Sequence, residues 1–156
     1  MLVRLATETD LPRVNELRGQ VSELHAAARP DFFHPGFPQS LRDHIHTIFE
    51  DESRYILVAE QDGEITAFAC LAEIEVPAKP HKPGRRFLDV DEFGVDEAHR
   101  REGIGRALME GIRDFAKAHG YDRIELNMWE FNENALKFYE SIGFCTYRRY
   151  MEYTIE

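Results

Sequence analysis

The stretch that decides the fold is Val95–Leu108, which reads VDEAHRREGIGRAL. An apolar, strand-like run ends at Val95, a polar segment follows, and Gly103 and Gly105 stand at the start of a helical apolar pattern. Glycines at such a turn let backbone N–H groups approach an anion closely. The positive end of the following helix dipole points at the same place. The stretch therefore predicts a loop that holds a phosphate group.

Three arginines, Arg100, Arg101 and Arg106, add positive charge to this loop in a chain whose formal net charge is −10. Two common phosphate-binding motifs are excluded. A P-loop requires Gly-Lys-Ser/Thr where this chain has Gly105-Arg106-Ala107. A dinucleotide fingerprint requires a third glycine at the position of Leu108. On spacing alone, an ordinary helix start with solvated arginines remains an alternative.

The elements expected on either side of the loop alternate between strands and helices. Strands are expected over 2–6, 55–59, 65–76, 86–95 and 124–128, around 144–145 and over 149–155. Helices are expected to carry Leu11–Leu24, Leu41–Phe49, Ile104–Ala116 and Asn134–Ile142. This order predicts an α/β fold with a mixed sheet and helices on both of its faces.

Length and composition limit the classes of protein. The 156 residues suit a single domain spanning 1–156. The net charge of −10 argues against a nucleic-acid partner and weakly favours a cationic substrate. No apolar run reaches the roughly 20 residues that span a bilayer, so no membrane partner is expected. Cys70 and Cys145 both lie in apolar, strand-like runs, and two buried thiols favour a cytoplasmic location.

A second stretch, Leu126–Phe144, reads LNMWEFNENALKFYESIGF. Together with Arg100-x-x-Gly103-x-Gly105 after a strand, it resembles the two signature blocks of the GNAT superfamily of acyl-CoA N-acyltransferases. The order of elements resembles that family over nearly the whole chain. The resemblance implies a GNAT-like mixed, mostly antiparallel central sheet of six to seven strands flanked by about four helices. It also implies that a splayed strand pair forms the acyl-CoA cleft.

The resemblance further implies acetyl-CoA as the acyl-donor co-substrate, with no metal. The residues that it assigns to the CoA pyrophosphate are Arg100, Arg101, Glu102, Gly103, Ile104, Gly105 and Arg106. The preceding strand would bind the pantetheine arm and the acetyl carbonyl through Phe93, Gly94 and Val95. Gly94 departs from the larger residue common there, and a glycine at this point suits a β-bulge. Asn132 would lie near the pantetheine, or it would serve as a plain helix N-cap.

The resemblance also implies catalytic roles. Tyr139 would protonate the leaving thiolate, the alternative being core packing. Asp91 and Glu92 are the candidates for the base that deprotonates the amine, the alternative being solvated or substrate-anchoring carboxylates. Asp89 lies on the same strand, and two-residue spacing places it on one face with Asp91 unless a bulge resets the register.

The expected function is transfer of an acetyl group from acetyl-CoA to a primary amine, that of a small molecule, by direct attack. Acetylation of a protein lysine or N-terminal amine is one alternative, and a non-catalytic acyl-CoA-binding module is another. Some protein-modifying members carry a glutamate where this chain has Asn127, which favours the small molecule. A homodimer is left open.

Overall fold

A computed structural model describes residues 1–155 of the chain. The elements in chain order are β1 (Leu2–Leu5), η1 (Glu8–Asp10), α1 (Leu11–Ala28), α2 (Gln39–Glu50), β2 (Arg54–Gln61), β3 (Glu64–Val76), β4 (Arg85–Val95), η2 (Glu97–His99), α3 (Ile104–Ala118), β5 (Ile124–Leu126) and α4 (Glu133–Ser141).

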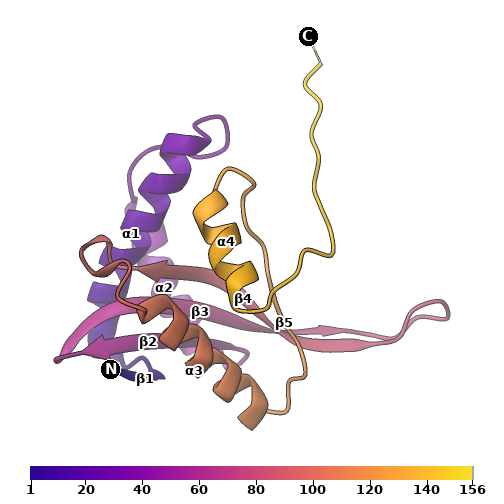
Figure 1. Cartoon of the computed structure of the whole chain (residues 1–156), viewed down its shortest axis with the longest axis horizontal. Coiled ribbons are helices and arrows are strands. Elements are labelled where there is room, and N and C mark those ends of the chain that lie inside the picture. Colours follow the sequence, from indigo (N-terminus) through magenta and orange to yellow (C-terminus); the bar gives the residue numbers. More distant parts are fainter. Residues whose placement is uncertain (156) are drawn as a thin grey trace.

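The strands form one sheet in the order β1-β2-β3-β4-β5. Neighbours are antiparallel except β4 and β5, which pair in parallel. The expected mixed α/β fold with four α-helices is confirmed, but the expected count of six to seven strands is wrong for the described residues, since the sheet has five. The two strands expected after residue 143 do not form, and that segment runs away from the body as an extended chain (Figure 1).

Two apolar cores hold the helices on opposite faces of the sheet (Figure 1). On one face, α1 and α2 pack through Leu17 and Ile48 against Phe68 and Cys70 of β3. On the other face, α3 packs through Leu108 and other apolar side chains against alternate residues of the same strands. Successive side chains of a strand point to opposite faces, so each core takes every second residue of β2 and β3.

A β-bulge in β4 changes which side chains share a face. Cys70 of β3 lies opposite Glu92, whereas the next residue, Leu71, lies opposite Val90. Asp91 is therefore the extra residue on β4. Because the register shifts by one at Asp91, Glu92 faces α1 together with Asp89, which simple alternation would have placed with Asp91.

The glycine at position 94 has a different role from the expected one. The bulge lies at Asp91, so Gly94 does not form it. A Cβ atom at Gly94 would lie 2.7 Å from the Phe68 ring and 2.8 Å from Cγ2 of Val21. Glycine is thus required because α1 crosses β4 closely at this point.

The remaining expectations concern the periphery. The β3–β4 loop, residues 77–84, is exposed and extends away from the body (Figure 1). Cys70 is buried, but Cys145 is exposed and lies outside any strand, so the expectation of two buried thiols is wrong. Within residues 1–155, no helix combines the length and the apolar character that crossing a bilayer requires. The cytoplasmic location stays a prediction.

The close crossing at Gly94 gives a test of the packing. Gly94→Ala should destabilise the fold by about 1–3 kcal/mol, because the added methyl group overpacks the contact with Phe68 and Val21. The free energy of unfolding from urea titration measures this cost. Gly19→Ala is the control, because its Cβ would meet Phe37 only at 3.9 Å. Equal stability of both variants and the wild type would show that α1 can move away from β4 at no cost.

Candidate active site

The site is built where β4 and β5 part. The two strands pair only over Leu88–Val90 and Ile124–Leu126. Beyond this point β4 runs on to Val95, whereas the chain after Leu126 turns toward α4. We call the region between residues 91–95 and 127–131 the splay. Its backbone groups on the β4 side that face β5 have no partner strand and are free to bind an extended ligand.

The loop that follows β4 has the conformation of an anion-binding turn. Arg101 and Gly103 both have a left-handed backbone, with φ of 69° and 81°. Gly103 is the N-cap of α3, and the first backbone N–H to reach a helical acceptor is that of Ala107, which donates to the Gly103 carbonyl. The N–H groups of the first turn of α3 are therefore left without helical acceptors and point out of the helix end.

Side chains around this loop leave it accessible. Arg100, Arg101 and Arg106 are exposed, and Arg100 makes only a long ion pair of 3.3 Å with Glu97. Gly105 faces inward, and its Cβ would lie 3.4 Å from the Phe138 ring. The second glycine of the signature thus lets α3 start close to α4, while Gly103 provides the turn.

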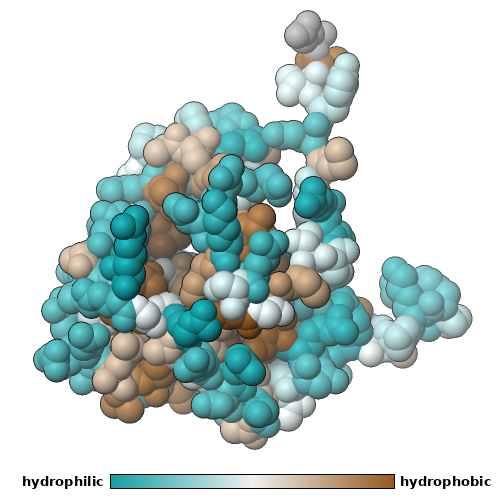
Figure 2. Space-filling view, in the orientation of Figure 1, coloured by the Kyte–Doolittle hydropathy of each residue, from teal (hydrophilic) through white to brown (hydrophobic). Residues whose placement is uncertain are grey.

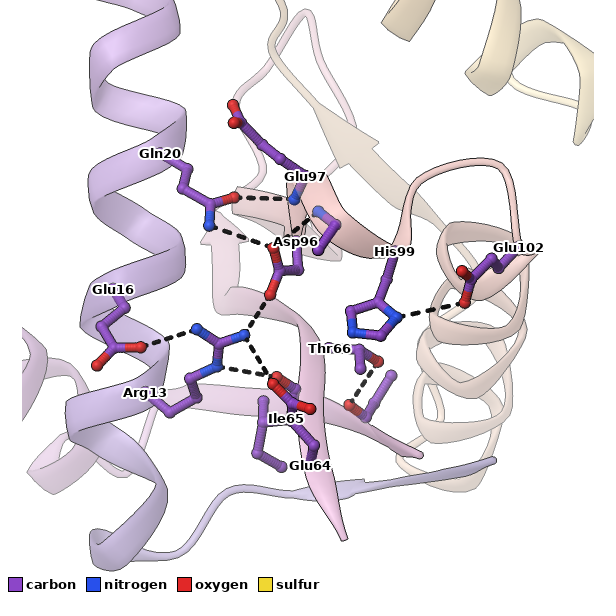
Figure 3. A network of polar contacts seen from close by, with 12 residues as sticks. Arg13, Glu16, Gln20, Glu64, Ile65, Thr66, Asp96, Glu97, His99 and Glu102 are labelled. Carbon is purple, nitrogen blue, oxygen red and sulfur yellow. Dashed lines mark hydrogen bonds and ion pairs between the residues drawn. The ribbon is translucent and has the colours of Figure 1, made fainter. Parts of the chain in front are cut away.

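Helix α1 holds the base of the loop from the other side (Figure 3). The Arg13 guanidinium pairs with Asp96, and Gln20 both donates to Asp96 and accepts the Glu97 backbone N–H at 3.0 Å. Asp96 also accepts the Ala98 N–H at 3.0 Å, which caps η2. Burial disfavours the ionised Asp96, but the bonds from Ala98, Gln20 and Arg13 outweigh burial and hold its pKa below the usual value. Helix α1 therefore fixes where the loop after β4 begins.

A group of possible metal ligands lies in the same network. Atoms of Glu64, Asp96 and His99 come within 4.8 Å of one another. Arg13 bonds to both Glu64 and Asp96, so its guanidinium already provides the positive charge that these carboxylates require (Figure 3). His99 faces Glu102 at 3.3 Å. The arrangement acts as an ion-pair network that supports the loop.

Tyr139 of α4 lies beside the splay. Its ring meets Phe93 of β4 at 6.1 Å and Phe144 at 5.6 Å between centroids. Burial raises the pKa of its phenol to about 12. Within residues 1–155 no group accepts a hydrogen bond from this hydroxyl. The ring packs as a core aromatic does, while its hydroxyl remains available to a ligand.

Asn132 is the N-cap of α4, and its side-chain oxygen accepts the Ala135 N–H at 3.1 Å. The cap interpretation is therefore confirmed. The amide nitrogen of the same side chain remains available as a donor.

The three carboxylates of β4 lie in different surroundings. Both oxygens of Glu92 accept hydrogen bonds from Arg18, at 2.8 and 2.9 Å. Arg18 is buried, and it also donates to Asn15 and to the Leu41 carbonyl. Asp91, the bulged residue, is exposed and pairs with Arg54.

Asp89 is half-buried and has no hydrogen-bond partner within residues 1–155. Burial, and then the charges of Asp91 and Glu125, raise the pKa of Asp89 to about 6. The sequence predicts that the base lies on this strand. The bulge determines which of its carboxylates has no partner, because it turns Glu92 toward Arg18.

An aromatic cluster, which we call the aromatic wall, joins the end of α1, the α1–α2 loop and the segment after β5. Its members are His25, Phe32, Phe33, Trp129 and Phe131. His25 stacks on Phe33 at 5.3 Å between ring centroids. Burial lowers the pKa of its imidazole, although the negative charge of Glu92 acts in the opposite direction. Trp129 and Phe131 lie about 100 residues further along the chain and join the other three only through the fold.

Comparison with known proteins agrees with this geometry. The model of the acetyltransferase (GNAT) family matches residues 21–144. The chain belongs to this family. An x-ray structure of a tetramutant of the BH1408 protein from Bacillus halodurans is 33% identical, with a TM-score of 0.94 over 99% of this chain and 100% of that chain.

Two other similar proteins share less of their sequence with this chain. Streptothricin acetyltransferase from Streptomyces lavendulae is 28% identical over 60% of this chain and 46% of its own length. The chain spans less than half the length of the curated relatives it matches. Aminoglycoside N-acetyltransferase AAC(6')-Iy, solved in complex with CoA, is 17% identical over 99% of this chain and 93% of that chain, with a TM-score of 0.77. That likeness shows the fold.

Proposed function

We propose that residues 1–156 act as one N-acetyltransferase domain, which moves the acetyl group of acetyl-CoA to the primary amine of a small molecule by direct attack. The observation that carries this proposal is the parting of β4 and β5 directly before an anion-binding turn. An extended ligand with a pyrophosphate at one end fits such an arrangement. The CoA in the complex of a fold relative supports the choice of ligand.

In this proposal, the backbone of the turn binds the pyrophosphate through Arg100, Arg101, Glu102, Gly103, Ile104, Gly105 and Arg106. The unpaired edge of β4 at Phe93, Gly94 and Val95 binds the pantetheine arm and the acetyl carbonyl. A backbone N–H aimed at that carbonyl oxygen stabilises the negative charge that develops on it. The free amide nitrogen of Asn132 extends the same path toward α4.

Three proton transfers accompany the reaction. Before the attack, one proton of the substrate ammonium goes to a carboxylate, directly or through water. The neutral amine then attacks the acetyl carbon, the new C–N bond forms, and the C–S bond breaks. The leaving thiolate takes a proton from the Tyr139 phenol, which burial keeps fully protonated at neutral pH. The second proton that the nitrogen loses as it becomes an amide returns to Tyr139.

Of the three carboxylates on β4, Asp89 suits the role of base best. Glu92 already uses both oxygens to hold Arg18, and Asp91 is paired with Arg54 at the surface. Asp89 is unpaired, and its pKa of about 6 makes it an ionised but usable base at neutral pH. We assign Glu92 a structural role, in which it holds α1 against β4 through Arg18. Asp91 is the extra residue of the bulge, and we assign it no catalytic role.

The acceptor would lie between the aromatic wall and Asp89. Acidic side chains and aromatic faces both attract an ammonium group. Streptothricin acetyltransferase among the relatives supports a small-molecule amine. A panel of amines, with thiol release from acetyl-CoA as the readout, tests the function directly. Turnover of protein amines alone favours the protein acetyltransferase, and tight acetyl-CoA binding without any turnover favours the acyl-CoA-binding module.

Removing the Tyr139 hydroxyl should slow the chemical step. Tyr139→Phe should lower turnover by the ~10²–10⁴ typical of losing a general acid, while acetyl-CoA affinity changes little. Single-turnover rates and calorimetric binding measure the two effects. Tyr55→Phe, which removes the same hydroxyl from a ring of β2 that packs on Phe115 of α3, is the control and should keep wild-type turnover. A Tyr139→Phe variant as fast as the control would reduce Tyr139 to a packing residue.

The pH profile should report the Asp89 carboxylate. A base must be ionised to act, so kcat/KM should fall as the pH drops through about 6, the pKa of Asp89. Asp89→Asn should lower turnover and remove this acidic limb, whereas Asp91→Asn should keep the limb and move it to lower pH, because the Asp91 charge raises the Asp89 pKa. An acidic limb unchanged in Asp89→Asn would assign proton removal to another group.

A further inference from the structure

A shallow hollow lies on the surface of the molecule between α3 and the end of α4. Its volume is about 40 Å³, and the residues that line it are Arg106, Met109, Glu110, Arg113 and Ile142. Four of them belong to α3, and Ile142 is the C-cap of α4. Figure 2 shows the face of the molecule that carries these two helices, where hydrophilic side chains cover most of the surface and apolar residues appear between them.

Two arginines on one face of α3 border this hollow. Arg106 and Arg113 are separated by close to two full turns, so their side chains point the same way, and their Cα atoms lie about 10 Å apart along the helix axis. Helical side chains tilt toward the N-terminus of their helix, so Arg113 leans back toward Arg106. A single small anion in the hollow is therefore within reach of both guanidinium groups.

Neither guanidinium group has a partner in the protein. Arg106 and Arg113 are exposed, and neither forms an ion pair or a side-chain hydrogen bond within residues 1–155. Glu110 lies between them at helix spacings that favour ion pairs, yet it pairs with neither. Most other arginines of the folded body pair with a carboxylate. The hollow thus has two free positive charges against one carboxylate.

The chemistry of the hollow suits a phosphate monoester that is attached to a larger group. A guanidinium group binds a phosphate through two parallel hydrogen bonds. A monoester carries about −1.5 to −2 charges at pH 7, which two arginines match. Met109 and Ile142 provide an apolar wall beside the arginines. Glu110 provides an acceptor for a hydroxyl or amino group of the same ligand.

The position of the hollow indicates which phosphate this is. Arg106 lies in the first turn of α3, beside the anion-binding turn at which the proposed function places the CoA pyrophosphate. That turn binds through its backbone, so the Arg106 side chain is free for a second anion. In CoA, a single ribose joins the pyrophosphate to a 3′-phosphate and to adenine. A CoA molecule whose pyrophosphate lies at the start of α3 therefore brings a phosphate monoester next to the hollow.

We propose that Arg106 and Arg113 bind the 3′-phosphate of CoA in this hollow, and that Arg113 distinguishes acetyl-CoA from a donor that lacks this phosphate. The inference rests on the proposed function, since it takes acetyl-CoA as the donor. It adds a second anion site, which holds the adenosine end of the donor along α3 while the thioester lies in the splay. No bond of the donor changes at this site, so the site contributes to binding.

Calorimetric binding of acetyl-CoA and of acetyl-3′-dephospho-CoA tests the proposal. The wild type should bind acetyl-CoA at least about tenfold more tightly, because the dephospho compound cannot form the charge-assisted hydrogen bonds. Arg113→Gln should bind the two compounds with nearly equal affinity, since it weakens the binding only of the compound that carries the phosphate. The Arg113 side chain is exposed, so this variant should keep its fold.

Lys117→Gln is the matched control. Lys117 is an exposed cation one turn further along the same helix, and it does not line the hollow. Its loss removes the same charge from α3, and it should leave the preference for acetyl-CoA unchanged.

Three results would overturn the assignment of the 3′-phosphate. These are equal affinity of the wild type for the two compounds, a preference that survives in Arg113→Gln, and a preference that Lys117→Gln reduces as much as Arg113→Gln does. A wild type that binds neither compound would contradict the proposed function itself, and with it the inference.

Discussion

The parting of β4 and β5 after Val90 and Leu126 is the constraint on which the site depends. Strands that stayed paired would bond the edge of residues 91–95 within the sheet, and no extended ligand could bind there. On the β3 side of β4, the bulge at Asp91 comes directly after the last residue paired with β5. A bulge bends and twists its strand, so β4 changes direction at the point where β5 leaves it. Beyond it, β4 still bonds to β3, so its free edge is held rigidly.

Helix α1 reinforces this geometry through three successive contacts with β4 and the loop after it. The buried Arg18 holds Glu92, Val21 packs on Gly94, and Arg13 and Gln20 bind Asp96 and Glu97. Loss of one partner of a buried ion pair such as Arg18–Glu92 costs about 3–5 kcal/mol, since the other charge is left uncompensated. Glu92, one of the two acidic residues that the sequence offered as a base, thus bonds through both of its oxygens to Arg18. Asp89 is left as the unpaired carboxylate on the α1 face of β4.

The sequence predicted the parts of the fold that local patterns encode. Gly103 and Gly105 indicated the turn and the helix that follows it, and apolar spacing located the four α-helices. The sequence could not predict the bulge at Asp91, because a bulge places two residues of one strand opposite one residue of its partner and so depends on both strands. Its consequence, that Asp89 and Glu92 share a face, was hidden for the same reason. The prediction of the last two strands is wrong for a different reason. Residues 145–155 have strand-like alternation, but a strand forms only where it can pair with the edge of another strand.

The central claim is that acetyl-CoA lies along the free edge of β4 with its pyrophosphate at the start of α3. Amide hydrogen exchange with and without acetyl-CoA tests this most directly. The account predicts slower exchange at residues 93–95 and 101–106, with no change in β1 and β2 at the far edge of the sheet. Protection confined to other parts of the chain, or none at saturating acetyl-CoA, would contradict it.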